Sequence, residues 1–102
     1  MKKNPYLNNG IYVKPTQVTM GDNIKLSYDG LLAKSGANEV YAHIGYGNRW
    51  DDTRDYKMIK TNIGFETSIP VTKTETLNVC FKDSTNNWDN NSGMNYTFEV
   101  IS

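Results

Sequence analysis

The 102-residue sequence predicts an all-β domain, and three observations lead to this prediction. Tyrosine is plentiful, with seven residues, and Asn, Thr, Ser and Gly are frequent, a composition that favours strands joined by turns. No segment repeats its apolar residues with the period of an amphipathic helix. Short alternating segments recur instead, about 8–12 residues apart, with turn residues between them. This pattern is typical of an immunoglobulin-like antiparallel β-sandwich of about seven strands.

The alternation of apolar and polar residues identifies the individual strands. In residues 39–46, Val40, Ala42 and Ile44 share one face, which we expect to be buried. His43 then lies on the opposite face, which we expect to be exposed. The segments that we expect to form strands are, in chain order, residues 11–13, 23–28, 39–46, 56–61, 65–71, 77–82 and 96–100.

The connections on either side of the His43 strand have features of their own. Residues 47–55 are polar and charged and contain a tryptophan, so we expect a long loop there. Residues 31–38 have no clear period, and we expect an irregular connection that buries Leu31 or Leu32 against the domain.

The length of the chain suits one domain and is too short for two. Residues 1–10 are polar and are predicted to be a lead-in or linker, whereas residues 11–102 are predicted to form a single module. Residues 1–3 resemble the start of a signal peptide, but no apolar run follows them. No stretch approaches the length of a membrane span. We therefore expect a module cut from a longer protein.

The charge and the cysteine content disfavour several kinds of partner. Eleven basic and eleven acidic residues give a formal net charge of zero. Proteins that bind nucleic acid or acidic lipid are usually markedly basic, so we expect neither nucleic acid nor membrane as a partner. Cys80 is the only cysteine, which rules out an intramolecular disulfide and a cysteine-based metal site. Bacterial secreted proteins often lack disulfides, so an extracellular location stays open.

Catalysis is not expected from this set of residues. A Cys–His nucleophile pair would need Cys80 beside His43, and the sequence does not show that they meet. No Gly-x-Ser-x-Gly elbow, Walker loop or His-Glu-x-x-His motif occurs. Asp51, Asp52 and Asp55 offer carboxylates for a glycosidase-like pair, but they are interspersed with arginines, which is more typical of a solvated face. We therefore predict that the chain is not an enzyme, with a small hydrolase as the alternative.

One oxygen-rich stretch, residues 89–93, has the composition of a calcium loop. It lacks the bidentate glutamate of an EF-hand, because Val100 stands at the twelfth position. We therefore predict no metal and no cofactor, and calcium stays open as the less favoured alternative.

The remaining signal is aromatic. Trp50 and Trp88 both lie in polar segments rich in Asn and Asp, and the His43 strand runs directly into the first of them. A flat indole covers the apolar face of a sugar ring, while Asn, His or Asp side chains bond its rim of hydroxyl groups. Two exposed indoles set at an angle would hold adjacent units of a curved sugar chain. The alternative is a structural or adhesion spacer of a cell-surface protein, in which both indoles are buried.

Two segments of the sequence resemble a known family. Residues 40–50, VYAHIGYGNRW, and residues 81–96, with the motif Asn-Trp-Asp-Asn-Asn and a later Asn-Tyr, are similar to the starch-binding carbohydrate modules of families 25 and 53. The likeness covers about residues 11–101. It implies an immunoglobulin-like β-sandwich that lacks catalytic activity and binds α-1,4-linked glucans such as starch and glycogen.

The resemblance also implies which residues form the site. By the family pattern these are His43, Trp50 and Trp88, together with Asn90, an amide expected to bond sugar hydroxyl groups. Modules of this kind are usually attached to secreted bacterial amylases or to plant starch synthases. The resemblance therefore implies an α-glucan partner, a monomeric module within a larger protein and an extracellular location.

Overall fold

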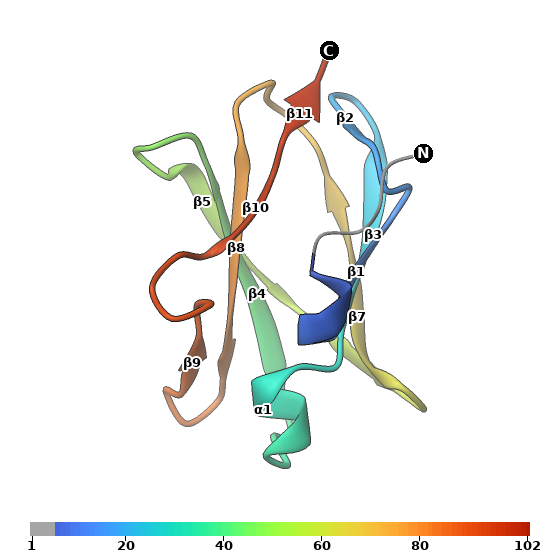
Figure 1. Cartoon of the computed structure of the whole chain (residues 1–102), viewed down its shortest axis with the longest axis vertical. Helices are drawn as coiled ribbons and strands as arrows, with labels where there is room; N and C mark the ends of the chain where they lie inside the picture. Colours follow the sequence, from blue (N-terminus) through green and yellow to red (C-terminus); the bar gives the residue numbers. More distant parts are fainter. Residues whose placement is uncertain (1–5) are drawn as a thin grey trace.

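The computed structural model describes residues 6–102 and has two β-sheets packed face to face, with β1, β3 and β7 in one layer and β4, β5, β8 and β10 in the other (Figure 1). The first sheet has the strand order β1-β3-β7-β6, and the second has the order β10-β8-β4-β5, with β9 added beside β8. Neighbouring strands within both sheets are antiparallel, and β2 and β11 form a small parallel pair. The elements are η1 (Leu7–Asn9), β1 (Ile11–Lys14), β2 (Val18–Thr19), β3 (Asn23–Tyr28), α1 (Leu31–Lys34), β4 (Val40–Tyr46), β5 (Asp51–Lys57), β6 (Ile59–Thr61), β7 (Gly64–Pro70), β8 (Leu77–Asp83), β9 (Trp88–Asp89), β10 (Tyr96–Phe98) and β11 (Val100–Ile101).

The predicted all-β antiparallel sandwich is confirmed. Within residues 6–102 the structure has eleven strands where the sequence predicts about seven. The difference comes from β2, β9 and β11, which have two residues each, and from β5. A strand of two residues is too short to show an alternating pattern, so the sequence does not reveal it.

The core lies between the two sheets and consists of the apolar faces that the alternation predicts. Ile24 and Leu26 of β3 point toward the second sheet, and Val40, Ala42 and Ile44 of β4 point back toward the first. All five side chains are at most 1% exposed. Burial of each large aliphatic side chain contributes about 1.5–3 kcal/mol, so this interface is the main source of stability.

The predicted long loop over residues 47–55 is wrong, because a tight turn at residues 47–50 leads directly into β5. β5 lies at the edge of the second sheet, paired with β4, and all its residues except Tyr56 are exposed. An edge strand with little buried surface needs no apolar alternation, and charged side chains protect it from pairing with other chains. The sequence signal on which the prediction depended is therefore missing in this strand.

The two segments before β4 also take definite structure. α1 makes a single helical turn that buries Leu32 and leaves Leu31 61% exposed. In the predicted lead-in, Tyr6 packs edge-on against Tyr96 and Phe98, whereas residues 1–5 lie outside the described residues. Among residues 6–102, no helix has the length and hydropathy needed to cross a membrane.

The buried carboxylate of Asp89, in β9, links the two sheets. Asp89 is 6% exposed and accepts hydrogen bonds from the hydroxyl groups of Tyr28 (2.6 Å) and Tyr96 (2.8 Å). The Tyr28 hydroxyl also accepts a hydrogen bond from the backbone N–H of Leu32 in α1. Burial, followed by the bond to Asp89, raises the pKa of both tyrosines above the ordinary range. One carboxylate therefore connects β3 of the first sheet with β9 and β10.

Replacing this carboxylate tests its contribution to the fold. Asp89→Ala leaves two buried hydroxyl groups without their acceptor, so we expect the free energy of unfolding to fall by about 2–4 kcal/mol. Urea denaturation measures the change. Asp22→Ala is the matched control, because Asp22 is exposed and its side chain forms no hydrogen bond or ion pair within residues 6–102. Equal stability of the two variants would contradict the structural role of Asp89.

Candidate functional site

The site begins on the outer face of the second sheet, along β4. The core residues of β4 alternate with Tyr41, His43 and Gly45, which therefore point away from the core. His43 pairs directly with Asp55 of β5 on one side and with Cys80 of β8 on the other. Directly paired residues of neighbouring strands share a face, so these three side chains form a row across the sheet.

The tight turn before β5 places Trp50 over this face. The Gly47 carbonyl accepts hydrogen bonds from the backbone N–H of Trp50 (3.2 Å) and from the Asn78 side chain (2.8 Å). Trp50 itself has a φ of 54°, a left-handed conformation that is uncommon for a residue other than glycine. Its indole then lies directly above Gly45, where an added Cβ would stand only 2.6 Å from Trp50 Cε3. A glycine at this position lets the indole approach the backbone of the sheet.

Trp88 lies on the same face of the sheet but comes from the side of β4 opposite to β5. It begins β9 and pairs with Lys82 of β8. The preceding turn is held by Asp83, whose carboxylate accepts hydrogen bonds from Thr85 and from the backbone and side chain of Asn87. Trp88 is 43% exposed, so it is not part of the core.

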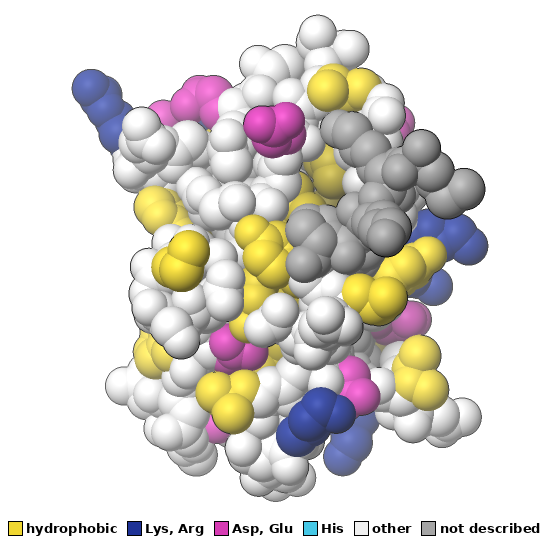
Figure 2. Space-filling model, in the orientation of Figure 1, with side chains coloured by type: hydrophobic (Ala, Val, Ile, Leu, Met, Phe, Trp, Pro, Cys, Tyr) yellow, Lys and Arg dark blue, Asp and Glu magenta, His cyan; other side chains and the backbone are white. Residues whose placement is uncertain are grey.

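The structure brings His43, Trp50 and Trp88 together. The imidazole of His43 stacks with the Trp50 indole at a centroid distance of 5.6 Å and an interplanar angle of 26°. It meets the Trp88 indole at 5.5 Å and 87°. The Trp50 indole therefore lies roughly parallel to the His43 ring, and the Trp88 indole is nearly perpendicular to that ring. We call this group of three residues the aromatic corner. Figure 2 shows a face on which no histidine is visible and charged groups of both signs are scattered.

Asp55 fixes the polar groups of the aromatic corner. Its carboxylate binds His43 Nδ1 at 2.5 Å and Lys82 Nζ at 2.7 Å, and Lys82 Nζ lies 5.4 Å from the centre of the Trp88 ring. Partial burial raises the pKa of Asp55, but the bonds from Lys82 and His43 outweigh it and hold that pKa below its ordinary value. An ionised carboxylate only accepts, so His43 Nδ1 carries the hydrogen and Nε2 is left for a ligand.

Cys80 lies in the same row of side chains but is buried from solvent. It is 5% exposed, and burial raises the pKa of its thiol to about 11. A thiol with a raised pKa is a poor nucleophile at neutral pH, although it stands directly opposite His43. The described residues contain no cluster of His, Cys, Asp and Glu side chains that could hold a metal ion.

Asn90 lies two residues after Trp88, and neither His43 nor Trp50 borders the hollow that it lines. Its side chain is exposed, and Oδ1 accepts a hydrogen bond from the backbone N–H of Gly93 at 3.0 Å, which closes the turn after β9. Asn90 and Trp88 both line a shallow hollow beside this turn. The side-chain amide of Asn90 therefore combines a structural bond with a position next to one of the indoles.

Sequence reasoning missed Gly45, Asp55 and Lys82 as parts of the site. A glycine within a strand often marks the close approach of another group, so Gly45 carried a usable signal. Asp55 was hidden because its segment was predicted to be a loop. The pairing of Asp55 with His43 and Lys82 depends on strand register, which the sequence alone does not determine.

Comparison with known proteins identifies the family. The family profile of a starch/carbohydrate-binding module (family 53) matches residues 24–81, more than half of the chain. The chain belongs to carbohydrate-binding module family 53. The matched segment includes His43 and Trp50 and ends before Trp88 and Asn90. No curated protein and no solved structure matches the chain.

Membership of family 53 confirms the predicted resemblance and gives the general function. The chain is a starch/carbohydrate-binding module, and its partner is a polysaccharide. The family consists of binding modules without catalytic activity, in agreement with the prediction that the chain is not an enzyme. Trp88 is exposed and Trp50 is half-buried, which does not fit the spacer alternative, in which both indoles would be buried.

Gly45→Ala tests whether the approach of Trp50 to the sheet matters. The added methyl group would clash with the indole, so we expect Trp50 to shift away from His43 while the β-sandwich stays folded. Retention on insoluble starch should fall about fivefold, which corresponds to about 1 kcal/mol. Ser68→Ala, on an exposed position of the other sheet, is the control. Wild-type retention by Gly45→Ala would show that the contact has no role in binding.

Asp83 makes the stability of the Trp88 turn dependent on pH. Hydrogen bonds from the side chain and backbone of Asn87 lower the pKa of Asp83. A lowered pKa stabilises the folded state above the ordinary value of about 3.9, and this contribution is lost as the pH falls through the lowered pKa. Urea midpoints measured at decreasing pH below about 4 should therefore decrease less in Asp83→Asn than in the wild type. An identical decrease in both proteins would contradict this role.

Proposed function

We propose that this module binds α-1,4-linked glucans through the aromatic corner and thereby brings a parent enzyme of the amylase type to its substrate. The observation that carries the proposal is the arrangement of half-buried Trp50 and His43 with exposed Trp88 on the outer face of the second sheet. Each indole offers a flat apolar surface to the C–H face of a glucose ring. The family membership supports a polysaccharide ligand of this kind.

The steep angle between the indoles favours the α-1,4 linkage. An α-1,4-linked glucan curves, so adjacent rings turn their faces in different directions. A β-1,4-linked glucan is extended and flat, and successive rings would need coplanar aromatic surfaces. The interplanar angles of 26° between Trp50 and His43 and 87° between His43 and Trp88 exclude a coplanar row of the two indoles.

Hydrogen bonds to the sugar hydroxyl groups complete the proposed site. His43 Nε2 lies on the ring between the two indoles, and Asp55 holds that ring by Nδ1. Asn90 follows Trp88 by two residues and supplies an amide at the edge of the site. An open site with few such bonds binds weakly, with a dissociation constant on the order of micromolar to millimolar, or roughly −4 to −8 kcal/mol.

Weak binding of this kind suits a module that acts within a larger protein. Repeated modules, or a module and an enzyme on one chain, gain retention on an insoluble substrate by avidity. We therefore infer a monomeric module in an extracellular protein that degrades or remodels starch-like glucans.

Titration of the intrinsic tryptophan fluorescence with maltoheptaose tests the proposal, with cellohexaose as the control sugar. We expect a saturable change with maltoheptaose alone, because a bound ring displaces water from the indoles. Trp88→Ala should abolish this binding and keep the far-UV circular dichroism of the fold, since Trp88 is not in the core. Wild-type affinity in Trp88→Ala, or equal responses to the two sugars, would refute the assignment.

A further inference from the structure

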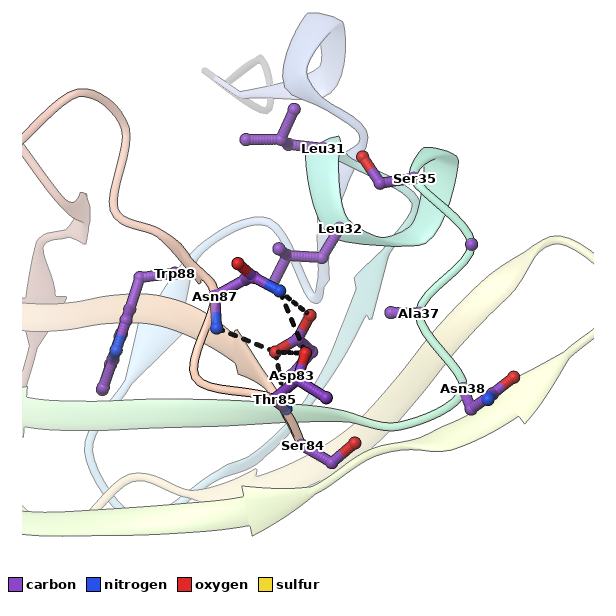
Figure 3. A pocket seen from close by; sticks show the side chains of 11 residues that line it. Leu31, Leu32, Ser35, Ala37, Asn38, Asp83, Ser84, Thr85, Asn87 and Trp88 are labelled. Carbon is purple, nitrogen blue, oxygen red and sulfur yellow. Dashed lines mark hydrogen bonds between the residues drawn. The ribbon is translucent and has the colours of Figure 1, made fainter.

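A hollow lies on the other side of Trp88. It has a volume of about 520 Å³ and is lined by α1 and the residues after it, by the turn between β8 and β9, and by Trp88. Figure 3 shows the Trp88 indole edge-on at one side of the hollow, with Asn87 and Asp83 beside it and Leu31 and Leu32 on α1. Pockets that bind small ligands commonly have volumes of about 300–1,000 Å³, so the size suits a sugar unit.

The hollow continues the line of the aromatic corner along β4. Trp50 lies over Gly45 near the end of β4, and His43 follows two residues closer to its start. Asn38, which lines the hollow, stands two residues before β4 begins. A strand of seven residues is about 20 Å long, so the aromatic corner and the hollow together form a track of about that length.

The lining of the hollow suits a carbohydrate. Leu31 is largely exposed beside it and offers an apolar surface. Within residues 6–102, the side chains of Ser35, Asn38 and Ser84 form no hydrogen bonds, so they are free to bond hydroxyl groups. The Asp83 carboxylate, in contrast, already accepts hydrogen bonds from Thr85 and Asn87 and stabilises the turn that borders the hollow.

We propose that this hollow is an additional subsite for a glucan chain that already occupies the aromatic corner. The chain passes Trp88, and a further glucose unit enters the space between α1 and the turn of residues 84–87. Trp88 then lies within the binding track and does not mark its end. The inference rests on the proposed function, because it names the continuation of the same ligand.

Filling the hollow separates this subsite from the aromatic corner. Ser35 is exposed at the end of α1, so Ser35→Leu places a bulky apolar side chain in the hollow without burying a polar group. Affinities for maltose, maltotriose and maltoheptaose are measured by calorimetry on the intact chain. We expect Ser35→Leu to weaken the binding of maltoheptaose at least threefold and to leave the binding of maltose and maltotriose unchanged.

Two further variants make the result decisive. Ser84→Leu fills the hollow from the opposite wall and should have the same effect, which covers the case in which Ser35→Leu does not fold. Ser68→Leu is the matched control on the exposed face of the other sheet and should bind all three sugars as the wild type does. Unchanged maltoheptaose affinity in a folded Ser35→Leu or Ser84→Leu protein would overturn the subsite and leave the proposed function standing. Failure of the wild-type chain to bind any of the three sugars would overturn both.

Discussion

The carboxylate of Asp89 is the constraint on which the site depends. A buried carboxylate is costly unless hydrogen bonds satisfy it, and here the hydroxyl groups of Tyr28 and Tyr96 do so. Because successive side chains of a strand point to opposite faces, burying Asp89 turns Trp88 outward. A shift of one residue would bury the indole and expose the carboxylate. The bonds within the core therefore determine which aromatic group the outer face presents.

The orientation of Trp50 is likewise determined by hydrogen bonds of the underlying backbone. Among residues 6–102, the non-glycine residues with a positive φ lie in two segments, residues 50–52 and residues 86–95, which contain Trp50 and Trp88. Such conformations cost free energy, and they persist where surrounding bonds hold them, as the bonds to the Gly47 carbonyl do here. Held indoles and a held imidazole lose little conformational entropy when a sugar binds. A shallow site gains affinity in this way without deep burial of its ligand.

The parts of the molecule that sequence reasoning predicted are those that repeat with a period of two. The buried positions of β3 and of the first half of β4 alternate clearly, and the outward position of His43 follows from the same pattern. In β8 the apolar residues of the sequence alternate, but residues 77–81 are all buried, including Asn78 and Cys80 on the outer face. β5 was missed because an edge strand that is exposed along most of its length has no apolar face to repeat. Missing β5 also hid Asp55, and the burial of Asp89 within a polar segment left no mark in the sequence. The aromatic residues in Asn- and Asp-rich segments made Trp50 and Trp88 candidates, and the family resemblance added Asn90. The local pattern alone could not distinguish an exposed indole from a buried one.

Charged residues on both sides of Trp88 position its indole between the aromatic corner and the hollow. Asp55 draws Lys82 toward His43, and this places the ammonium group close to the indole. A cation near an aromatic ring is attracted to it and limits its movement. On the hollow side, Asp83 holds the turn that leads into Trp88 through bonds to Thr85 and Asn87. Asp55 and Asp83 thus fix the orientation of the Trp88 indole from opposite sides. In that orientation, one side of the indole borders the aromatic corner and the other borders the hollow.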